Sequence, residues 1–297
     1  MESLKIFFVA GAFFLSFSAA AAADNHAPSI EDLDRSIAIN PSSADAYYDR
    51  AILWEKQGDL AKAVSDFTEA IKLNPQDAGA YYGRSNAYAN QHNYIQAILD
   101  YNKILEINPQ DATAYYDRGL SYSNQGNIPQ AIHDFTQAIR INPDYAESYH
   151  NRGISWYRTG DLTQAIADLN KSIELGPADA VAYYNRGICY YKEGMFIDAI
   201  NDFSKAIKLD GGYAESYTNR GEAYVQLDDF AEARFDFTKA IEINPGIPQS
   251  YNNRAICYYQ LKQYTKAWGD LQKAKGLGYA VDPAFVATVQ KALGQKN

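Results

Sequence analysis

Apolar and polar positions recur with a period of 34 residues along most of this 297-residue chain. Each period holds two stretches in which small and aromatic residues follow one another at spacings of three and four, the spacing of one face of an α-helix. Tyr47, Ala51 and Trp54 show it in a first stretch, and Ala63 and Phe67 show it in the second. The pattern predicts two helices per unit, from about the second to about the fourteenth residue and from about the eighteenth to about the thirtieth.

A short turn, often containing Gly, separates the two predicted helices. Asn-Pro commonly ends the second one, because Pro cannot continue a helix. These Asn-Pro pairs are separated by 34 residues or multiples of 34, and they set the boundaries of seven units. A position within a unit is called a slot and is numbered from the first residue of the unit. The units span residues 44–77, 78–111, 112–145, 146–179, 180–213, 214–247 and 248–281.

Several slots keep one kind of residue in every unit. The fourth slot is always Tyr, from Tyr47 to Tyr251, and the twentieth is always Ala, from Ala63 to Ala267. The eighth slot is Ala, Ser or Gly, and the eleventh is Tyr or Trp. Small residues let two helices approach closely, and aromatic rings fill the gaps around them.

This period and these slots resemble the tetratricopeptide repeat (TPR) family over residues 44–281. The resemblance implies an all-α fold, a right-handed α-solenoid of helix-turn-helix repeats, in which the first helix of each repeat lines a concave groove. It also implies a protein that binds other proteins or peptides. Arg at the seventh slot departs from the commonest family pattern. Together with Gly at the eighth slot of four repeats, it marks an Arg-Gly variant.

The ends of the array differ from its interior. Residues 24–43 form a linker and a half-repeat, because residues 30–41 match only a second helix. Residues 282–297 form a capping helix, with Asp282 and Pro283 at its start and an apolar stripe that covers the last repeat.

A ladder of opposite charges accompanies the repeats. The seventh slot holds Arg50, Arg84, Arg118, Arg152, Arg186, Arg220 and Arg254, and the twenty-third holds Asp66, Asp100, Asp134, Asp168, Asp202, Asp236 and Asp270. Because the half-repeat supplies Asp32 but no Arg, each Asp is expected to pair with the Arg of the following repeat and to fix the register between repeats. A ligand-binding role for these Arg side chains is the alternative.

The resemblance places slots two, five, six, nine, twelve and thirteen in the groove. Candidate peptide-binding residues there are Asn151, Asn185, Asn219 and Asn253 at slot six, Tyr48, Tyr82, Tyr116 and Tyr184 at slot five, and Tyr157, Tyr191 and Tyr259 at slot twelve. An Asn side chain donates to and accepts from the backbone of an extended peptide, and Tyr gives rigid contact area. A solvated polar stripe is the alternative. Slot five holds no Lys or Arg, which disfavours a carboxylate-terminated ligand.

Residues 1–23 have the features of a secretory signal peptide: Lys5, an apolar run and a small-residue end before Asp24. They predict export, to the periplasm of a Gram-negative cell and otherwise to the extracellular space. An uncleaved N-terminal membrane anchor is the alternative.

The remaining chemistry is sparse. A net charge of −9 without a basic cluster argues against nucleic-acid binding. His26, His92, His133 and His150 show no metal-ligand spacing, and no phosphate-binding loop occurs. Cys189 and Cys257 lie two repeats apart, too far for a disulfide, and are expected to be buried thiols. The sequence therefore predicts no cofactor, no metal, no small-molecule substrate and no enzyme.

The sequence favours a scaffold or adaptor of the cell envelope that binds an extended segment. A homo-oligomer that stacks through its terminal helices is the second hypothesis. An enzyme is the least favoured one, because few residues lie outside the repeats.

Overall fold

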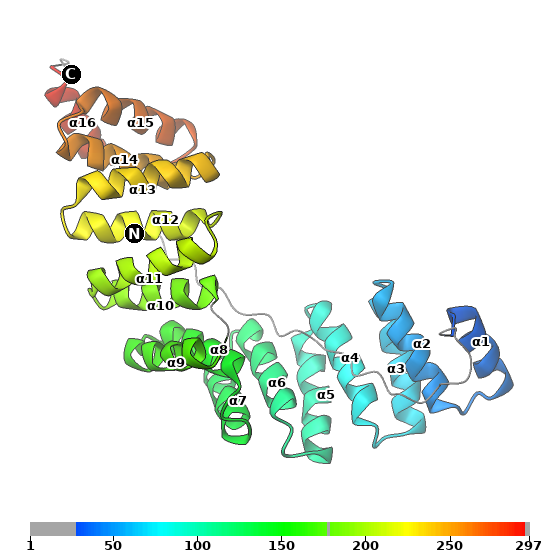
Figure 1. The fold of residues 1–297 in the computed structure, drawn as a ribbon. Coiled ribbons are helices and arrows are strands. Elements are labelled where there is room, and N and C mark those ends of the chain that lie inside the picture. Colours follow the sequence, from blue (N-terminus) through cyan, green and yellow to red (C-terminus); the bar gives the residue numbers. More distant parts are fainter. Residues whose placement is uncertain (1–27, 177–178, 295–297) are drawn as a thin grey trace. The chain divides into compact units, whose positions relative to one another are not determined.

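The computed structural model describes residues 28–176 and 179–294, and this part of the chain contains sixteen α-helices and no β-strand (Figure 1). It divides into two compact units, which meet in the sequence between Thr159 and Gly160 and are described separately below. The predicted signal peptide, residues 1–23, lies outside the described residues.

The N-terminal unit consists of a half-repeat helix followed by three and a half repeats. Its helices are α1 (Ile30–Ile39), α2 (Ala44–Lys56), α3 (Leu60–Leu73), α4 (Ala78–Asn90), α5 (Tyr94–Ile107), α6 (Ala112–Gln125), α7 (Ile128–Ile141) and α8 (Ala146–Thr159). Each helix packs against the next one in the chain. The first helix of a repeat, here called helix A, also contacts the helix A of the next repeat, as α2 contacts α4 and α6 contacts α8.

The C-terminal unit continues the same pattern. Its helices are α9 (Leu162–Leu175), α10 (Ala180–Lys192), α11 (Phe196–Leu209), α12 (Ala214–Gln226), α13 (Phe230–Ile243), α14 (Pro248–Gln260), α15 (Tyr264–Gly276) and α16 (Pro283–Ala292). Neighbouring A helices again touch, α10 with α12 and α12 with α14. Within each unit the A helices thus form one layer and the second, B helices form the other.

Capping residues fix where the helices begin and end. The side chains of Ser43, Asp77 and Asp111 accept hydrogen bonds from backbone N–H groups of the first turns of α2, α4 and α6. These helices therefore begin one residue earlier than the periodicity predicts, because the cap is the last residue before the repeat. At the other end of α3, Asn74 is the C-cap and donates its N–H to Ala70, and Pro75 follows.

The turn from helix A to helix B has one conformation in every repeat. The residue at slot fifteen has a φ angle between 58° and 90° in Gly58, His92, Gly126, Gly160, Gly194, Asp228 and Lys262. Such left-handed backbone favours Gly, and three repeats adopt it with a side chain present.

A small core fills the space between the two helices of each repeat. The Ala at slot twenty is fully buried in every repeat, and the residue at slot twenty-four is at most 1% exposed in Phe67, Tyr101, Phe135, Leu169, Phe203, Phe237 and Leu271. A Cβ atom on Gly187 would lie 2.8 Å from the Phe203 ring, so Gly at slot eight makes room for that ring. Burial of one such side chain stabilises the fold by about 1.5–3 kcal/mol.

Both ends of the array are covered by single helices. Leu33 of α1 is buried against α2. At the other end, Phe285, Val286 and Leu293 join the cluster around buried Val289 and Leu271. The apolar stripe predicted for the last helix therefore packs on the last repeat, as a solenoid end requires.

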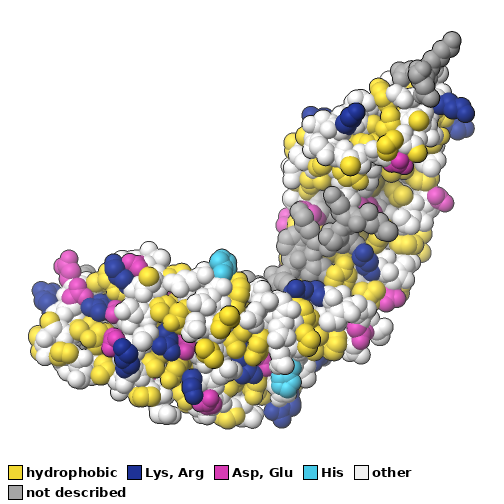
Figure 2. All heavy atoms as spheres, turned by 180° about the vertical axis from the view of Figure 1, so that it is seen from behind, with side chains coloured by type: hydrophobic (Ala, Val, Ile, Leu, Met, Phe, Trp, Pro, Cys, Tyr) yellow, Lys and Arg dark blue, Asp and Glu magenta, His cyan; other side chains and the backbone are white. Residues whose placement is uncertain are grey.

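Outside this core, hydrophobic side chains are scattered among acidic and basic ones over each unit on the face shown in Figure 2. The most exposed large one is Ile39, at 86%, which lies at the end of α1.

Candidate ligand-binding groove

The Arg at slot seven pairs with the Asp of its own repeat in every repeat that lies within a single unit. In six repeats its Nε and Nη2 atoms donate to the two oxygens of the Asp sixteen residues later, at 2.6–2.8 Å. The pairs are Arg50–Asp66, Arg84–Asp100, Arg118–Asp134, Arg186–Asp202, Arg220–Asp236 and Arg254–Asp270. The remaining repeat is the one that contains the boundary between the two units, with Arg152 in the N-terminal unit and Asp168 in the C-terminal unit. The predicted direction, from each Asp to the next repeat, is wrong.

The third nitrogen of each Arg provides the link between repeats. Nη1 donates, at 2.6–3.2 Å, to the residue at slot twenty-five of the preceding repeat or half-repeat. These acceptors are Asp34, Thr68, Asn102, Thr136, Asn170, Ser204 and Thr238. Slots twenty-three and twenty-five lie about 200° apart around a helix, so one faces its own helix A and the other faces the next. Asp32, expected as a partner of Arg50, instead caps α1 with Ser29 and pairs with Arg35.

These Arg side chains are fully engaged inside the fold. Besides the three bonds, each guanidinium lies 5.3–5.7 Å from the ring centre of the Tyr at slot four. Burial raises the pKa of Asp100 although Arg84 opposes the shift, which indicates that desolvation offsets much of the attraction. The arrangement is structural: in the six pairs every nitrogen of the guanidinium already donates within the fold, which disfavours a ligand-binding role for these Arg groups.

The contact line between A helices forms the floor of the groove in each unit. Slot two of one helix faces slot five of the preceding one, as a Cβ atom on Gly79 would lie 3.6 Å from the Tyr48 ring. Slot thirteen of one helix faces slot twelve of the preceding helix A, as Nη1 of Arg158 in α8 donates to the hydroxyl of Ser123 in α6 at 3.2 Å. Slots two, five, twelve and thirteen, four of the six that the resemblance assigns to the groove, therefore lie at contacts between neighbouring A helices.

The Asn residues at slot six lie beneath this line. Asn151 and Asn185 are fully buried and Asn219 is 7% exposed. The side-chain amide of Asn151 donates to the hydroxyl of Tyr116 in the preceding repeat at 2.9 Å, and that of Asn219 donates to Tyr184 in the same way.

Asn253 is half-buried and donates to Glu222 at 3.0 Å. The expectation of an open Asn ladder is therefore wrong for the three buried residues. At Asn151 and Asn219, slot six points at the neighbouring helix A rather than into the groove.

Two of the predicted groove tyrosines belong to the core. Tyr116 and Tyr184 are at most 1% exposed, and each ring centre lies 4.9 Å from that of a second Tyr, Tyr145 or Tyr213. These second tyrosines occupy the last slot of the repeat, and their signal in the sequence is the recurrence of Tyr exactly 68 residues apart.

The other predicted tyrosines, Tyr48, Tyr82, Tyr157, Tyr191 and Tyr259, are half-buried. The Tyr259 ring packs 5.7 Å from Phe285 of α16 and so also belongs to the C-terminal cap. Tyr48, Tyr82, Tyr157 and Tyr191 remain the predicted contact residues of the groove.

The groove of the N-terminal unit is acidic. Its carboxylates, which sequence analysis did not single out as one group, are Asp45, Asp49, Glu55, Asp77, Asp111, Asp117 and Glu147. In the described part of the unit none of them forms an ion pair with Lys or Arg. Burial raises the pKa of Glu55, and burial together with the charge of Asp45 raises that of Asp49.

Asp117 is the most perturbed of these groups. Its side chain is 6% exposed, and burial, aided by the charge of Asp111, raises its pKa to about 7. The same slot holds Asn in the four following repeats.

Profiles of the family described as Tetratricopeptide repeat match residues 17–82, 56–112, 112–145, 180–213, 214–247 and 237–269, and a TPR repeat profile matches residues 155–194. The chain belongs to the tetratricopeptide repeat family. No curated protein sequence matches it. The TPR fold is a protein-interaction scaffold, which agrees with a groove that carries no catalytic constellation in its described residues.

Solved structures agree with this assignment. YrrB, described as a TPR protein with an unusual peptide-binding site, is 28% identical, with 60% of this chain and 92% of that chain covered and a TM-score of 0.54. A TPR protein from Parabacteroides merdae (19% identity, 85% and 99% covered, TM-score 0.62) shares the fold. So does the C-terminal part of a TPR repeat-containing protein from Cytophaga hutchinsonii (20% identity, 83% and 99% covered, TM-score 0.68).

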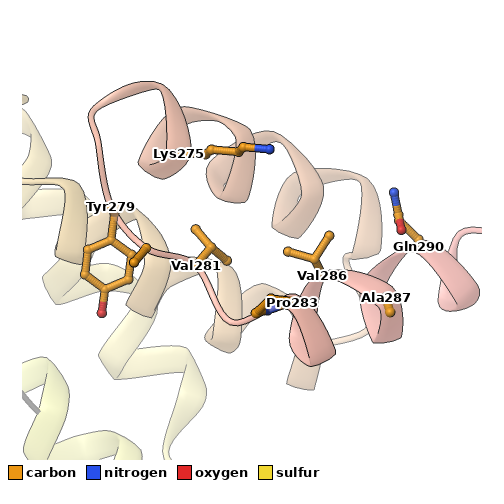
Figure 3. Close-up of a pocket in the computed structure, with 8 residues that line it drawn as sticks. Lys275, Tyr279, Val281, Pro283, Val286, Ala287 and Gln290 are labelled. Carbon is orange, nitrogen blue, oxygen red and sulfur yellow. The ribbon is translucent and has the colours of Figure 1, made fainter.

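Other candidate sites offer little chemistry. A recess of about 350 Å³ between α15 and α16 is lined by Lys275, Tyr279, Ala280, Val281, Pro283, Val286, Ala287 and Gln290 (Figure 3). Lys275 is the one charged residue in this mostly apolar lining. Among residues 28–176 and 179–294, no group of three or more His, Cys, Asp or Glu could hold a metal ion. No helix in those ranges has the length and apolarity of a membrane span.

The two cysteines are buried and unpaired, as predicted. Burial raises the pKa of the Cys189 and Cys257 thiols to about 12, so both act as small apolar groups rather than nucleophiles.

Proposed function

We propose that this protein is a non-catalytic adaptor that holds an extended peptide or protein segment along the groove formed by its A helices. The observation that carries the proposal is the row of half-buried tyrosines beside carboxylates that form no ion pair in the N-terminal unit. Tyr48 and Tyr82 offer flat contact area at low entropic cost, and the carboxylates offer acceptors. YrrB, whose described peptide-binding site is called unusual, supports peptide binding by a related array.

Site-specific photo-crosslinking tests the groove. A photoreactive benzoylphenylalanine is placed at Asn90 or Asn124, which are exposed at slot thirteen of α4 and α6. Matched controls carry it at Leu99 of α5 or Gln130 of α7, exposed residues on B helices. Adducts with envelope proteins are expected from the two groove positions. Adducts from the B-helix positions alone would move the binding surface to the opposite layer and overturn the groove.

The location of this activity is part of the proposal. Residues 1–23 support export, and the adaptor is therefore proposed to act in the cell envelope. N-terminal sequencing of the protein purified from its native host tests this: a chain that begins at Asp24 supports cleavage and export. A chain that begins at Met1 and sediments with membranes supports the anchor instead.

Self-assembly through the terminal helices is the second candidate function. The observation in its favour is Ile39, a large apolar side chain that is 86% exposed at the end of α1. Light scattering of the mature chain distinguishes the candidates, because stacking gives a mass that grows with concentration and an adaptor stays monomeric. Ile39→Ser is expected to abolish any such growth.

A further inference from the structure

The junction between the second and third repeats contains two polar groups without partners. Asp117 of α6 is 6% exposed, and within the described residues its carboxylate forms no hydrogen bond or ion pair. The hydroxyl of Tyr82, on the preceding helix A, is buried and makes no hydrogen bond, although Asp111 lies near enough for its carboxylate to raise the pKa of Tyr82 in addition to the effect of burial. An unpaired buried polar group destabilises the fold, and an unpaired buried charge does so more strongly.

The equivalent junctions elsewhere show what a satisfied pair looks like. At these same two slots, Asn151 donates to Tyr116 and Asn219 donates to Tyr184, each at 2.9 Å. The Asn amide donates to the Tyr hydroxyl, whereas a carboxylate can only accept from it, and the Tyr82 hydroxyl makes no such bond to Asp117. With Asp at position 117 this junction therefore lacks the internal bond, and the carboxylate remains an acceptor that a ligand can use.

The surroundings of Asp117 favour a positively charged ligand group. Asp111 lies close enough for its charge to raise the pKa of Asp117, and Asp117 in turn raises the pKa of Tyr82, Tyr101 and Tyr145 in addition to the effect of burial. Two carboxyls and several aromatic rings thus meet at one place. Carboxylates pair with a cationic head, and ring faces attract it and cover its apolar stem.

We propose that Asp117, together with Asp111 and Tyr82, forms a pocket that takes a Lys or Arg side chain from a segment bound along the groove. The proposal rests on the proposed function and names the chemistry of the partner: an extended, basic segment. The other carboxylates of the N-terminal unit, such as Asp49 and Glu55, extend the same sign of charge along the groove and add to the attraction.

The test is a selection of peptides from a phage-displayed random dodecapeptide library on three forms of the immobilised mature protein. These are the wild type, Asp117→Asn and the matched control Asp144→Asn, which removes the same charge from an exposed residue outside the groove. Asp117→Asn is expected to fold, because Asn occupies this slot in four other repeats. Wild type and the Asp144 control are expected to enrich Lys- and Arg-containing peptides, and Asp117→Asn is expected to lose that enrichment.

The best peptide is then synthesised with Arg, and again with citrulline, which keeps the shape and removes the charge. Fluorescence anisotropy is expected to show at least tenfold tighter binding of the Arg peptide to wild type and equal binding of both to Asp117→Asn. Selection of neutral or acidic peptides that bind both forms equally would overturn the pocket and leave groove binding intact. Failure to enrich any peptide, together with groove positions that give no crosslinks, would overturn both proposals.

Discussion

Two repeat junctions use the same pair of slots in opposite ways. Between the fifth and sixth repeats, Tyr184 and Asn219 are buried and bonded to each other. Between the second and third, the hydroxyl of half-buried Tyr82 and the carboxylate of buried Asp117 form no hydrogen bond within the described residues. The Arg and Asp framework is the same at both junctions, since Arg118 and Arg220, each in the repeat that follows its junction, make the same bidentate contacts. The difference shows how an array can vary its groove chemistry through one slot while the framework stays constant.

The largest expected effect concerns the framework. Arg220→Ala leaves Asp236, which is fully buried, without its partner, and is expected to lower the free energy of unfolding by about 3–5 kcal/mol. Arg84→Ala is expected to give a similar loss in the other unit, because Asp100 is 4% exposed. Urea denaturation followed by circular dichroism measures both. A loss below 1 kcal/mol in either unit would show that the framework is not equivalent in the two places.

The second expected effect concerns the open junction. The pKa of Asp117 is raised from 3.8 to about 7 in the folded state, so between these values the folded state binds more protons than the unfolded state. The free energy of unfolding of the wild type therefore decreases as pH rises from about 4 to about 7.

Asp117→Asn removes this decrease and is expected to stabilise the protein by up to about 4 kcal/mol at pH 8 and very little at pH 4. Besides Asp111, the phenols of Tyr82, Tyr101, Tyr116 and Tyr145 lie within electrostatic range of Asp117, and these phenols titrate above this range. Urea denaturation across this pH range is the measurement. If the free energies of unfolding of the variant and the wild type changed with pH in parallel, the view that Asp117 is buried without a partner would be refuted.

Introducing Asn at the same slot one repeat earlier is expected to lower the free energy of unfolding rather than raise it. Slot six of the second repeat is Gly83, and a Cβ atom there would lie 2.2 Å from the Phe67 ring. Gly83→Asn is therefore expected to destabilise the protein by about 1–3 kcal/mol through overpacking. Thermal denaturation beside Asp117→Asn makes the comparison direct. Stabilisation by both variants would mean that Asn suits the slot regardless of its surroundings.

The smallest expected effect concerns the link between repeats. Thr68 accepts a hydrogen bond from Nη1 of Arg84 at 3.1 Å, and Thr68→Val removes this acceptor at constant shape. The expected loss is about 0.5–1.5 kcal/mol, because the bidentate contact to Asp100 remains. Urea denaturation is again the measurement, with Thr238→Val as the counterpart in the C-terminal unit. A loss as large as that of Arg84→Ala would place the main framework energy between repeats.

Periodicity was enough to predict the helices, the core slots and the two terminal helices. The apolar and small residues that mark them recur because they are buried at equivalent places in every repeat. It could not predict the direction of the Arg–Asp pairs. Asp66 and Thr68 lie two residues apart on one helix, and a period of 34 does not say which of them faces which neighbour. The recurrence of hydrogen-bond acceptors at slot twenty-five was the signal that could have resolved it.

The groove was harder to predict than the fold. Asn219 and Asp117 occupy one slot, and their burial depends on how closely neighbouring A helices approach, which no single repeat records. The carboxylates were visible in the sequence as separate residues at several slots. They became one group only when the contacts between helices brought those slots onto one line.

The Nη1 contact has a consequence for how such a chain can change length. Asp, Asn, Ser and Thr all serve as its acceptor, so a duplicated or deleted unit of 34 residues finds a compatible neighbour wherever it is inserted. Copying one repeat, however, does not copy the proposed pocket for a Lys or Arg side chain, because Tyr82 and Asp117 come from two adjacent repeats. Evolution can therefore lengthen this array freely, but it can move that specificity only by transferring neighbours together.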